Sequence, residues 1–202
     1  MRIAVAGNKG SFSHQAGVMY VAANGLENIE FNYVLDSEGV FAALTQQVAD
    51  LGIVPMYNPT GGLVKMTLEA MGKHNFTIES TFDMPVEQCL LALPHARQDE
   101  IRTVVSHQQA LAQCQKYLNI QMSDCQLVEY SDTAQAAADL ATGKLDATCA
   151  VLAPKLCAQL YGLRVVAENI QDDDRNQTHF LVVKQHLPPN PPPISGEGEK
   201  KL

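Results

Sequence analysis

Three loops that follow predicted strands and open predicted helices carry small hydroxyl residues. They are Gly10-Ser11-Phe12-Ser13, Pro59-Thr60-Gly61-Gly62 and Ser106-His107-Gln108. The free backbone N–H groups and the dipole of a helix N-terminus bind an anion without any arginine. The same hydroxyl residues are also ordinary helix N-caps, each stabilising its helix by about 1 kcal/mol. The pair Gly61-Gly62 favours binding, because glycine lets the backbone approach a ligand closely.

The loops lack the signatures of nucleotide binding and of nucleophilic catalysis. None ends in the Gly-Lys-Ser/Thr of a phosphate-binding loop, and the chain contains no Gly-x-Ser-x-Gly motif. His14, His107 and His179 have no evident Ser or Cys partner in the sequence. Gln109 and Gln113 are four residues apart and therefore share one helix face, which fits either a site or a solvated surface.

The composition predicts a globular protein of a reducing compartment. The 202 residues are 46% hydrophobic and 18% charged, with a formal net charge of −8. This charge argues against nucleic acid or an anionic membrane as partner, since both attract clustered Lys and Arg. The five cysteines are odd in number and lack the paired spacing of a zinc site, so we expect reduced, mostly buried thiols, no metal and a cytoplasmic location. The apolar run 1–7 is too short for a signal peptide, and no stretch approaches the ~20 apolar residues of a membrane span.

Alternating strands and helices must position these loops. Apolar runs predict strands at 2–6, 31–35, 51–55, 76–80, 87–93, 102–105, 126–130, 146–151, 163–167 and 179–183. Helical spacing predicts helices at 14–23, 38–47, 63–71, 108–118, 134–142 and 153–160. Ser37 and Ser106 are predicted caps, and 56–62 is predicted to be a loop. The alternation predicts an α/β fold with a largely parallel sheet.

Two sets of these units predict two lobes. The first spans residues 1–79 and regains the last strand, within 169–186, while the second spans 80–168. Ligands of open α/β sheets bind at the carboxyl ends of strands, so we expect the pocket in a cleft between the lobes. Residues 187–202 are rich in Pro, Gly and charge without periodicity, which predicts a disordered tail.

Four segments resemble, in order and spacing, the motifs of prephenate dehydratases over about residues 1–185. The segment 7–16 is similar to the family's Gly-Pro-x-Gly-Thr-Phe-Ser, 51–64 to Val-Pro-Ile-Glu-Asn-Ser, 106–114 to Ser-His-Pro-Gln-Ala-Leu-x-Gln-Cys, and Tyr161-Gly162-Leu163 with 170–180 to the closing Asn-x-Thr-Arg-Phe region. The resemblance implies two lobes of the periplasmic-binding-protein (type II) type around a central cleft. It also implies prephenate as substrate, no cofactor, and a homodimer.

The resemblance places catalytic groups at Asn58, Ser106, Gln113 and Thr178, and a substrate-binding aromatic ring at Phe180. The loops add the further candidate substrate contacts Ser11, Phe12, Ser13, Thr60, Gly61 and Gly62. All of these groups are uncharged. Such a set orients a substrate that is primed to lose carbon dioxide, and it stabilises the charge that moves, rather than supplying a nucleophile.

Three departures from the family pattern suggest a different product. Tyr57 stands in place of Glu, Pro59 in place of Ser and His179 in place of Arg, and we expect no regulatory ACT domain after residue 186. We therefore predict a stand-alone prephenate decarboxylase of specialised metabolism, which keeps the ring hydroxyl and protonates a ring carbon. In this hypothesis Tyr57 or His179 shapes the site or delivers the proton. The alternatives are an ordinary prephenate dehydratase and a catalytically inactive prephenate-binding module.

Overall fold

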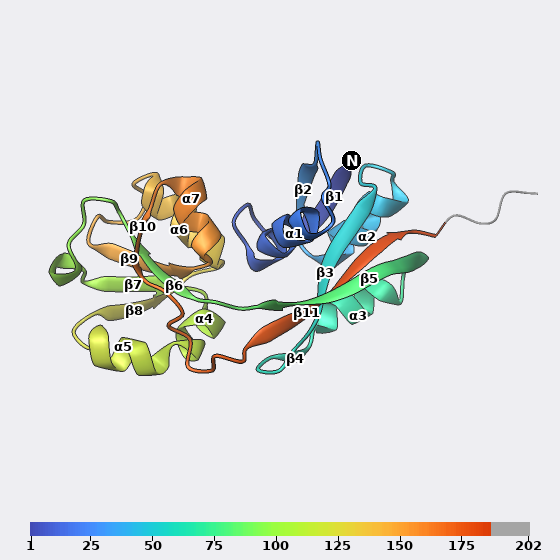
Figure 1. Cartoon of the computed structure of the whole chain (residues 1–202). Coiled ribbons are helices and arrows are strands. Elements are labelled where there is room, and N and C mark those ends of the chain that lie inside the picture. The colour runs from blue at the N-terminus through green and yellow to red at the C-terminus, as the bar shows by residue number, and fades with distance from the viewer. Residues whose placement is uncertain (187–202) are drawn as a thin grey trace, which may run out of the picture.

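The chain folds into two α/β lobes joined by two crossing segments (Figure 1). The computed structural model describes residues 1–186, so the predicted tail at 187–202 lies outside the described residues. The first lobe contains β1 (Arg2–Ala6), α1 (Phe12–Ala23), β2 (Glu30–Val34), α2 (Ser37–Thr45), β3 (Leu51–Asn58), β4 (Gly62–Leu63), α3 (Lys65–Met71), β5 (Phe76–Pro85) and β11 (Gln177–Gln185). The second contains β6 (Cys89–Ala92), the 3-10 turn Gln98–Glu100, β7 (Thr103–Ser106), α4 (Gln108–Gln113), α5 (Gln115–Gln121), β8 (Gln126–Glu129), α6 (Thr133–Ala141), β9 (Cys149–Ala153), α7 (Lys155–Tyr161) and β10 (Arg164–Ala167).

Both sheets are mixed, so the prediction of a largely parallel sheet is wrong. The first has the order β2-β1-β3-β11-β5, with β4 beside β3, and the second has the order β10-β6-β9-β7-β8. Strands of the βαβ units pair in parallel, whereas β11 runs antiparallel to both β3 and β5. In the second sheet β6 is likewise antiparallel to β9 and β10. The reversed strands are those next to the crossings, because the chain leaves one lobe through β5 and returns through β11.

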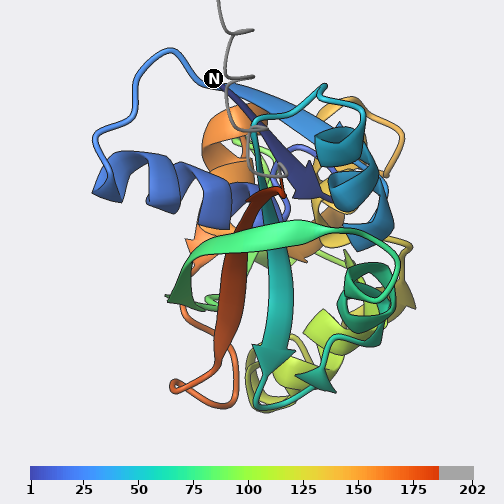
Figure 2. The same cartoon turned by 90° about the vertical axis from the view of Figure 1, so that its right-hand side faces the viewer.

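Helices cover both faces of each sheet. In the first lobe α1 packs on one face, while α2 and α3 pack on the other (Figure 2). In the second lobe α6 and α7 cover one face, and α4 and α5 cover the other. The central strands of each sheet are therefore buried. The expected architecture, two α/β lobes around a central cleft, is confirmed.

Three local predictions are corrected by tertiary contacts. The N-cap of α2 is Asp36, whose Oδ1 accepts from the Gly39 N–H at 2.9 Å, and Ser37 is the first helical residue. Ser106 is not a cap: it ends β7, and its hydroxyl donates to the Leu152 carbonyl at 2.7 Å. The predicted loop at 56–62 begins with a continuation of β3, because these residues still pair with β11 and β4.

The first sheet also reaches further along the chain than the expected lobe boundary at residue 79. β5 continues in this sheet to Pro85, where it lies opposite Gln177 of β11. Among residues 1–186, none of the helices has both the length and the apolar character needed to cross a membrane.

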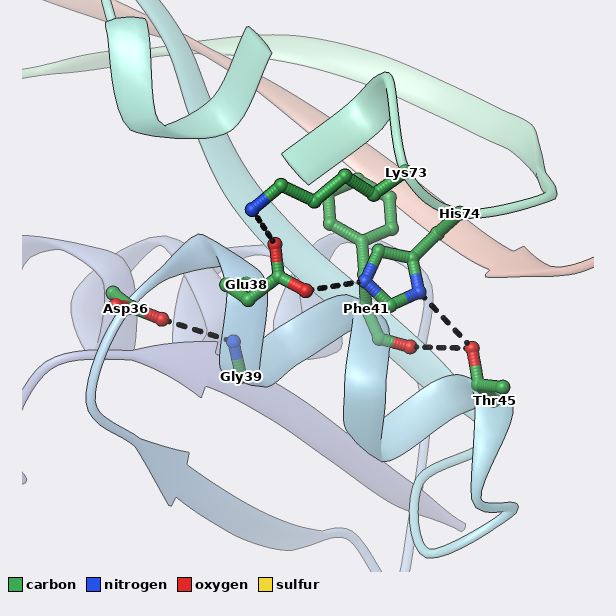
Figure 3. A network of polar contacts seen from close by, with 7 residues as sticks. All are labelled: Asp36, Glu38, Gly39, Phe41, Thr45, Lys73 and His74. Atoms are coloured by element: carbon green, nitrogen blue, oxygen red, sulfur yellow. Dashed lines mark hydrogen bonds and ion pairs between the residues drawn. The ribbon is translucent and has the colours of Figure 1, made fainter. Parts of the chain in front are cut away.

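A polar network ties α2 to the end of α3 on the outside of the first lobe (Figure 3). Glu38 accepts from His74 Nε2 at 2.6 Å and from Lys73 Nζ at 3.2 Å. The hydrogen bond from His74, followed by that from Lys73, lowers the pKa of Glu38 below its usual value. The His74 ring also stacks on the buried Phe41, so the network fixes how α3 sits against α2.

Candidate active site

A cavity of about 490 Å³ lies between the two lobes. The first lobe contributes the ends of β1 and β3 and the starts of β11, α1 and α2. The second contributes the start of α6 and much of α4. The sequence-predicted residues on its wall are Ser11, Phe12, Ser13, Asn58, Gly61, Gly62, Gln113, Thr178 and Phe180. Those that do not line it are Tyr57, Thr60, Ser106 and His179.

Strand geometry explains this division on β11. Alternate side chains of a strand point to opposite faces, so Thr178 and Phe180 share the cavity face while His179 points away. Phe180 is buried and its ring stacks on Phe82 at a centroid distance of 5.7 Å. His179 instead places Nδ1 2.9 Å from Asp83 Oδ1, and its cross-strand neighbour on β3 is Tyr57. Both side chains are more than one-third exposed.

Asn58 joins the elements that meet at the cavity. Its Nδ2 donates to Thr178 Oγ1 at 2.9 Å, to Asn176 Oδ1 at 2.9 Å and to the Gln177 carbonyl at 3.1 Å. Its Oδ1 accepts from the backbone N–H groups of Thr60 at 2.9 Å and Gly61 at 3.2 Å. Because Thr178 Oγ1 accepts from this amide, its own O–H hydrogen is left to donate towards the cavity.

The N-terminus of α1 forms another wall of the cavity. Ser11 is the N-cap, and its hydroxyl accepts from the His14 N–H at 3.2 Å. The loop before it is held by His14 Nδ1, which accepts from the Gly10 N–H at 3.0 Å. Burial, and secondarily the charge of Lys9, lowers the pKa of His14 to about 4. His14 is therefore neutral near pH 7 and acts as a structural acceptor.

The second lobe brings a pair of glutamines to the cavity. Gln88 Nε2 donates to Gln113 Oε1 at 3.3 Å. Gln88 is 2% exposed, and among residues 1–186 its Oε1 has no hydrogen-bond partner. Gln88 was not predicted from the sequence, because it lies in the crossing segment between β5 and β6 and belongs to no motif.

Two other predicted site residues, Ser106 and Thr60, do not line the cavity between the lobes. Ser106 is fully buried and holds β7 to β9 through its hydrogen bond to Leu152. Thr60 lines a separate cavity of about 240 Å³ beside the first, together with Gln109 and Gln113. The glutamines of α4 therefore form part of both cavity walls.

The charge of the cavity wall is negative. Its ionisable residues are Asp36, Asp132 and His107, and the wall contains no Lys or Arg among the described residues. Both aspartates cap helices, Asp36 at α2 and Asp132 at α6. Neutral donors must therefore hold any anion: hydroxyls, amides and the N-terminus of α1. Each aspartate lies two residues before a predicted helix and just after a predicted strand, so the sequence pattern could have identified both as candidate caps.

The cysteines offer no nucleophile. All five are free and four are buried, as predicted. Burial is the main cause that raises the pKa of Cys114 and of Cys157 to about 12, so both are protonated thiols near pH 7. Within residues 1–186, no three His, Cys, Asp or Glu side chains gather closely enough to hold a metal ion.

Comparison with known proteins gives one consistent result. A family model described as prephenate dehydratase matches residues 3–187. Arogenate dehydratase 5, chloroplastic, of Arabidopsis thaliana is 35% identical over 91% of this chain and 42% of its own length. The bifunctional chorismate mutase/prephenate dehydratase of Stutzerimonas stutzeri is 30% identical over 94% of this chain and 50% of its own. The chain thus spans about half the length of these curated relatives.

Solved structures show the same fold. The prephenate dehydratase from Arthrobacter aurescens, in complex with L-Phe, has a TM-score of 0.81 at 24% identity, covering 93% of this chain and 61% of that one. The prephenate dehydratase from Staphylococcus aureus has a TM-score of 0.76 at 22% identity, covering 93% of this chain and 67% of that one.

Proposed function

The chain belongs to the prephenate dehydratase family, and on that premise we propose that it is a lyase that removes the ring carboxylate of prephenate in the cavity between its lobes. The observation that carries the proposal is the hydrogen bond from Asn58 Nδ2 to Thr178 Oγ1 at 2.9 Å. It leaves the threonine hydroxyl as an oriented neutral donor on a cavity wall that has no Lys or Arg among the described residues. Orientation and donors aimed at developing charge are what this elimination requires.

The proposed product is phenylpyruvate. In this reaction the electron pair of the breaking carbon–carboxylate bond moves into the ring, carbon dioxide leaves, and the ring hydroxyl departs with a proton as water. Thr178 is proposed to donate to the departing hydroxyl. Two of the three departures that suggested another product, Tyr57 and His179, lie on the face of the sheet away from the cavity. Because neither side chain lines the cavity, these two departures give no reason to expect a product other than that of the ordinary dehydratase.

A second candidate is decarboxylation with the hydroxyl kept, as in specialised metabolism. One observation favours it: among the described residues the cavity wall has no Lys or Arg, and Thr178 is a weak acid. Loss of hydroxide needs a strong donor, whereas decarboxylation followed by protonation of a ring carbon does not place negative charge on the hydroxyl oxygen. The remaining departure, Pro59, lies directly after Asn58 in the sequence.

The test is to incubate the purified protein with prephenate and follow the product by ultraviolet absorbance and mass. Phenylpyruvate, lighter by one water than the hydroxyl-retaining product, is the expected result. The heavier, non-aromatic product would replace the dehydratase proposal with the decarboxylase. Binding without turnover would point to the inactive binding module. Arogenate is offered in parallel, because arogenate dehydratases are among the relatives.

Matched variants at one position assign the role of the hydroxyl. Thr178→Val removes the hydroxyl at nearly constant shape, and we expect turnover to fall by about 10²- to 10³-fold. Thr178→Ser keeps the donor and is expected to retain much of the activity. Equal losses of turnover in both variants would mean that the reaction does not depend on the hydroxyl of residue 178.

We also propose that the protein works in the cytoplasm as a homodimer. The cysteines support a reducing location, since all five are free. Light scattering coupled to size-exclusion chromatography tests the dimer, and a monomer mass at micromolar concentration would contradict it. Fractionation of cells that express the protein tests the location.

A further inference from the structure

The two lobes also touch at a point outside the two crossing segments. There the loop between β1 and α1 meets α7 and the start of α6. Tyr161 Oη donates to the Lys9 carbonyl at 2.6 Å, and Cys157 Sγ donates to the Gly10 carbonyl at 3.3 Å. Asn8 Nδ2 also lies 3.4 Å from Asp132 Oδ1. The function proposed above gives no role to Tyr161 or Cys157.

The contact is close because residue 10 has no side chain. A Cβ at Gly10 would lie 2.7 Å from Cys157 Sγ and 3.4 Å from Tyr161 Cε2. Gly10 also has a φ of +96°, which other residues rarely adopt. On its own lobe the loop is fixed by the Gly10 N–H bond to His14. The second lobe therefore meets a rigid part of the first.

We propose that Tyr161 and Cys157 are positioning residues that clamp the second lobe onto the first and so hold the cavity closed. The cavity needs groups from both lobes, since Thr178 belongs to the first and Gln113 to the second. Within the described residues, the chain crosses between the lobes only at 86–88 and 168–176. Rotation about these two segments would move the cavity groups of one lobe away from those of the other. A clamp of neutral hydrogen bonds keeps the competent arrangement populated before substrate arrives.

Population arithmetic gives the kinetic consequence. When only a fraction of the free protein is competent, the apparent dissociation constant rises by the inverse of that fraction, while the bound state is unaffected. Loss of the clamp should therefore raise KM and leave kcat nearly unchanged. A residue needed only for stability would not produce this split, and a catalytic residue would lower kcat.

The decisive variant is Tyr161→Phe, which removes the hydroxyl and keeps the ring. Small-angle X-ray scattering of the free variant should give a larger radius of gyration than the wild type, and saturating prephenate should restore the wild-type value. KM for prephenate should rise about two- to tenfold, as expected for one lost neutral hydrogen bond, with kcat within about twofold. An unchanged radius of gyration in the free variant, or a fall in kcat at constant KM, would overturn the clamp.

Two controls separate the clamp from general damage. Tyr130→Phe removes a hydroxyl that bonds to Asp139 at 2.7 Å within the second lobe, and it should change neither the radius of gyration nor KM. Cys157→Ala should open the free protein as Tyr161→Phe does, whereas Cys157→Ser keeps a donor and should stay closed. Opening in the serine variant as well would assign the effect to packing and contradict the proposal.

The kinetic part rests on the function proposed above, and the scattering of the free protein does not. If prephenate proves not to be the substrate while the free variant still opens, the clamp stands and the proposed function falls. If prephenate is turned over and the free variant keeps the wild-type radius, the proposed function stands and the clamp falls.

Discussion

At the scale of single residues, Asn58 acts through its neighbours. Every polar atom of its side chain bonds to protein: the Nδ2 group to three acceptors on 176–178, and the Oδ1 to two backbone donors of the adjoining loop. An amide used in this way has little capacity left for substrate. Its contribution is to fix the Thr178 hydroxyl and the loop that carries Gly61, so Asn58 is better described as a positioning residue than as a catalytic one.

Asn58→Asp tests this description, because the carboxylate keeps the shape and the acceptor but loses the donors. Oxygen would then face oxygen at Asn176 and Gln177, and the Thr178 hydroxyl would turn to donate to the carboxylate and no longer towards the cavity. We expect kcat to fall by about 10²-fold, and the free energy of unfolding by about 1–3 kcal/mol, as for a buried group left without its partner. Steady-state kinetics and urea unfolding measure the two effects. Wild-type stability in this variant would show that the hydrogen bonds of Asn58 contribute little to the free energy of unfolding.

Tyr57 and His179 lie on the opposite face of the same strands, and this predicts a negative result. The double variant Tyr57→Glu with His179→Arg restores the family residues at both positions. We expect the ratio of the two products from prephenate to stay as in the wild type, because neither side chain lines the cavity. Mass analysis of the products is the measurement, with the wild type assayed in parallel. A changed ratio would mean that these residues act through the sheet.

Once these residues are placed on strands, the sequence predicts which of their side chains share a face. Asn58 and Tyr57 are adjacent, and so are Thr178 and His179, so strand alternation alone separates each pair. The sequence-based strands ended at Pro55 and began at His179, which left the functional residues in loops. The pairing of β3 with β11 and β4 extends these strands, and pairing between distant segments is not visible in local pattern.

At the scale of elements, His14 links α1, the preceding loop and β2. Its Nδ1 accepts from Gly10, and its Nε2 lies 3.1 Å from Tyr33 Oη. The folded pKa of His14 is about 4, below the ordinary value of 6.5, and the main cause is burial. The unfolded chain therefore takes up a proton at this residue at higher pH than the folded chain.

The sign of the pH dependence follows. Above pH 6.5 neither state is protonated at His14, and the fold keeps its full stability there. As the pH falls towards 4, the unfolded state gains the proton first and stability is lost, by roughly 3 kcal/mol in total. Urea unfolding from pH 7.5 to 4 measures the loss, with His14→Gln as the control that cannot titrate. A constant stability difference between the two proteins over this range would contradict the assignment.

The caps of the helices show which local signals are reliable. Ser11 caps α1 as a hydroxyl residue of this loop was expected to, through its bond to a backbone N–H of the first turn, but the helix begins at Phe12, two residues before the predicted start. Ser106 has the same local pattern, but the cap prediction is wrong there, because its hydroxyl donates to the carbonyl of Leu152 on a neighbouring strand. At α2 the N-cap is Asp36, one residue before the predicted cap Ser37. Local sequence rules cannot predict an acceptor that a distant segment supplies, such as the Leu152 carbonyl.

At the scale of the whole molecule, the repeated units predicted two lobes with a cleft, and the cavity lies there. The direction of the crossing strands was not predictable, since β5 and β11 owe their antiparallel pairing to the route of the chain between the lobes. The contacts that set the relation of the lobes were equally hidden. They join residues more than a hundred positions apart, such as Tyr161 with Lys9.

A second interlobe contact lies at Gly61, where a Cβ would be 3.1 Å from Gln109 Nε2 of α4. Gly61→Val would place methyl groups against the end of this side chain, within the wall of the cavity. Overpacking of this kind costs about 1–3 kcal/mol, so we expect prephenate affinity to fall by about tenfold or more. Titration calorimetry measures the loss. Gly72→Val, at a glycine whose Cβ would meet only ordinary contacts, is the matched control and should bind normally.

The partner residue decides whether the loss comes from that contact. If Gln109 is the obstacle, Gln109→Ala should recover part of the affinity lost in Gly61→Val, and the double variant should bind better than the sum of the single losses predicts. Strictly additive losses would show that Gly61 and Gln109 act independently. The cleft would then be set by the contact at Gly10 alone, and Gly61→Val would reduce binding by altering the loop that Asn58 orders.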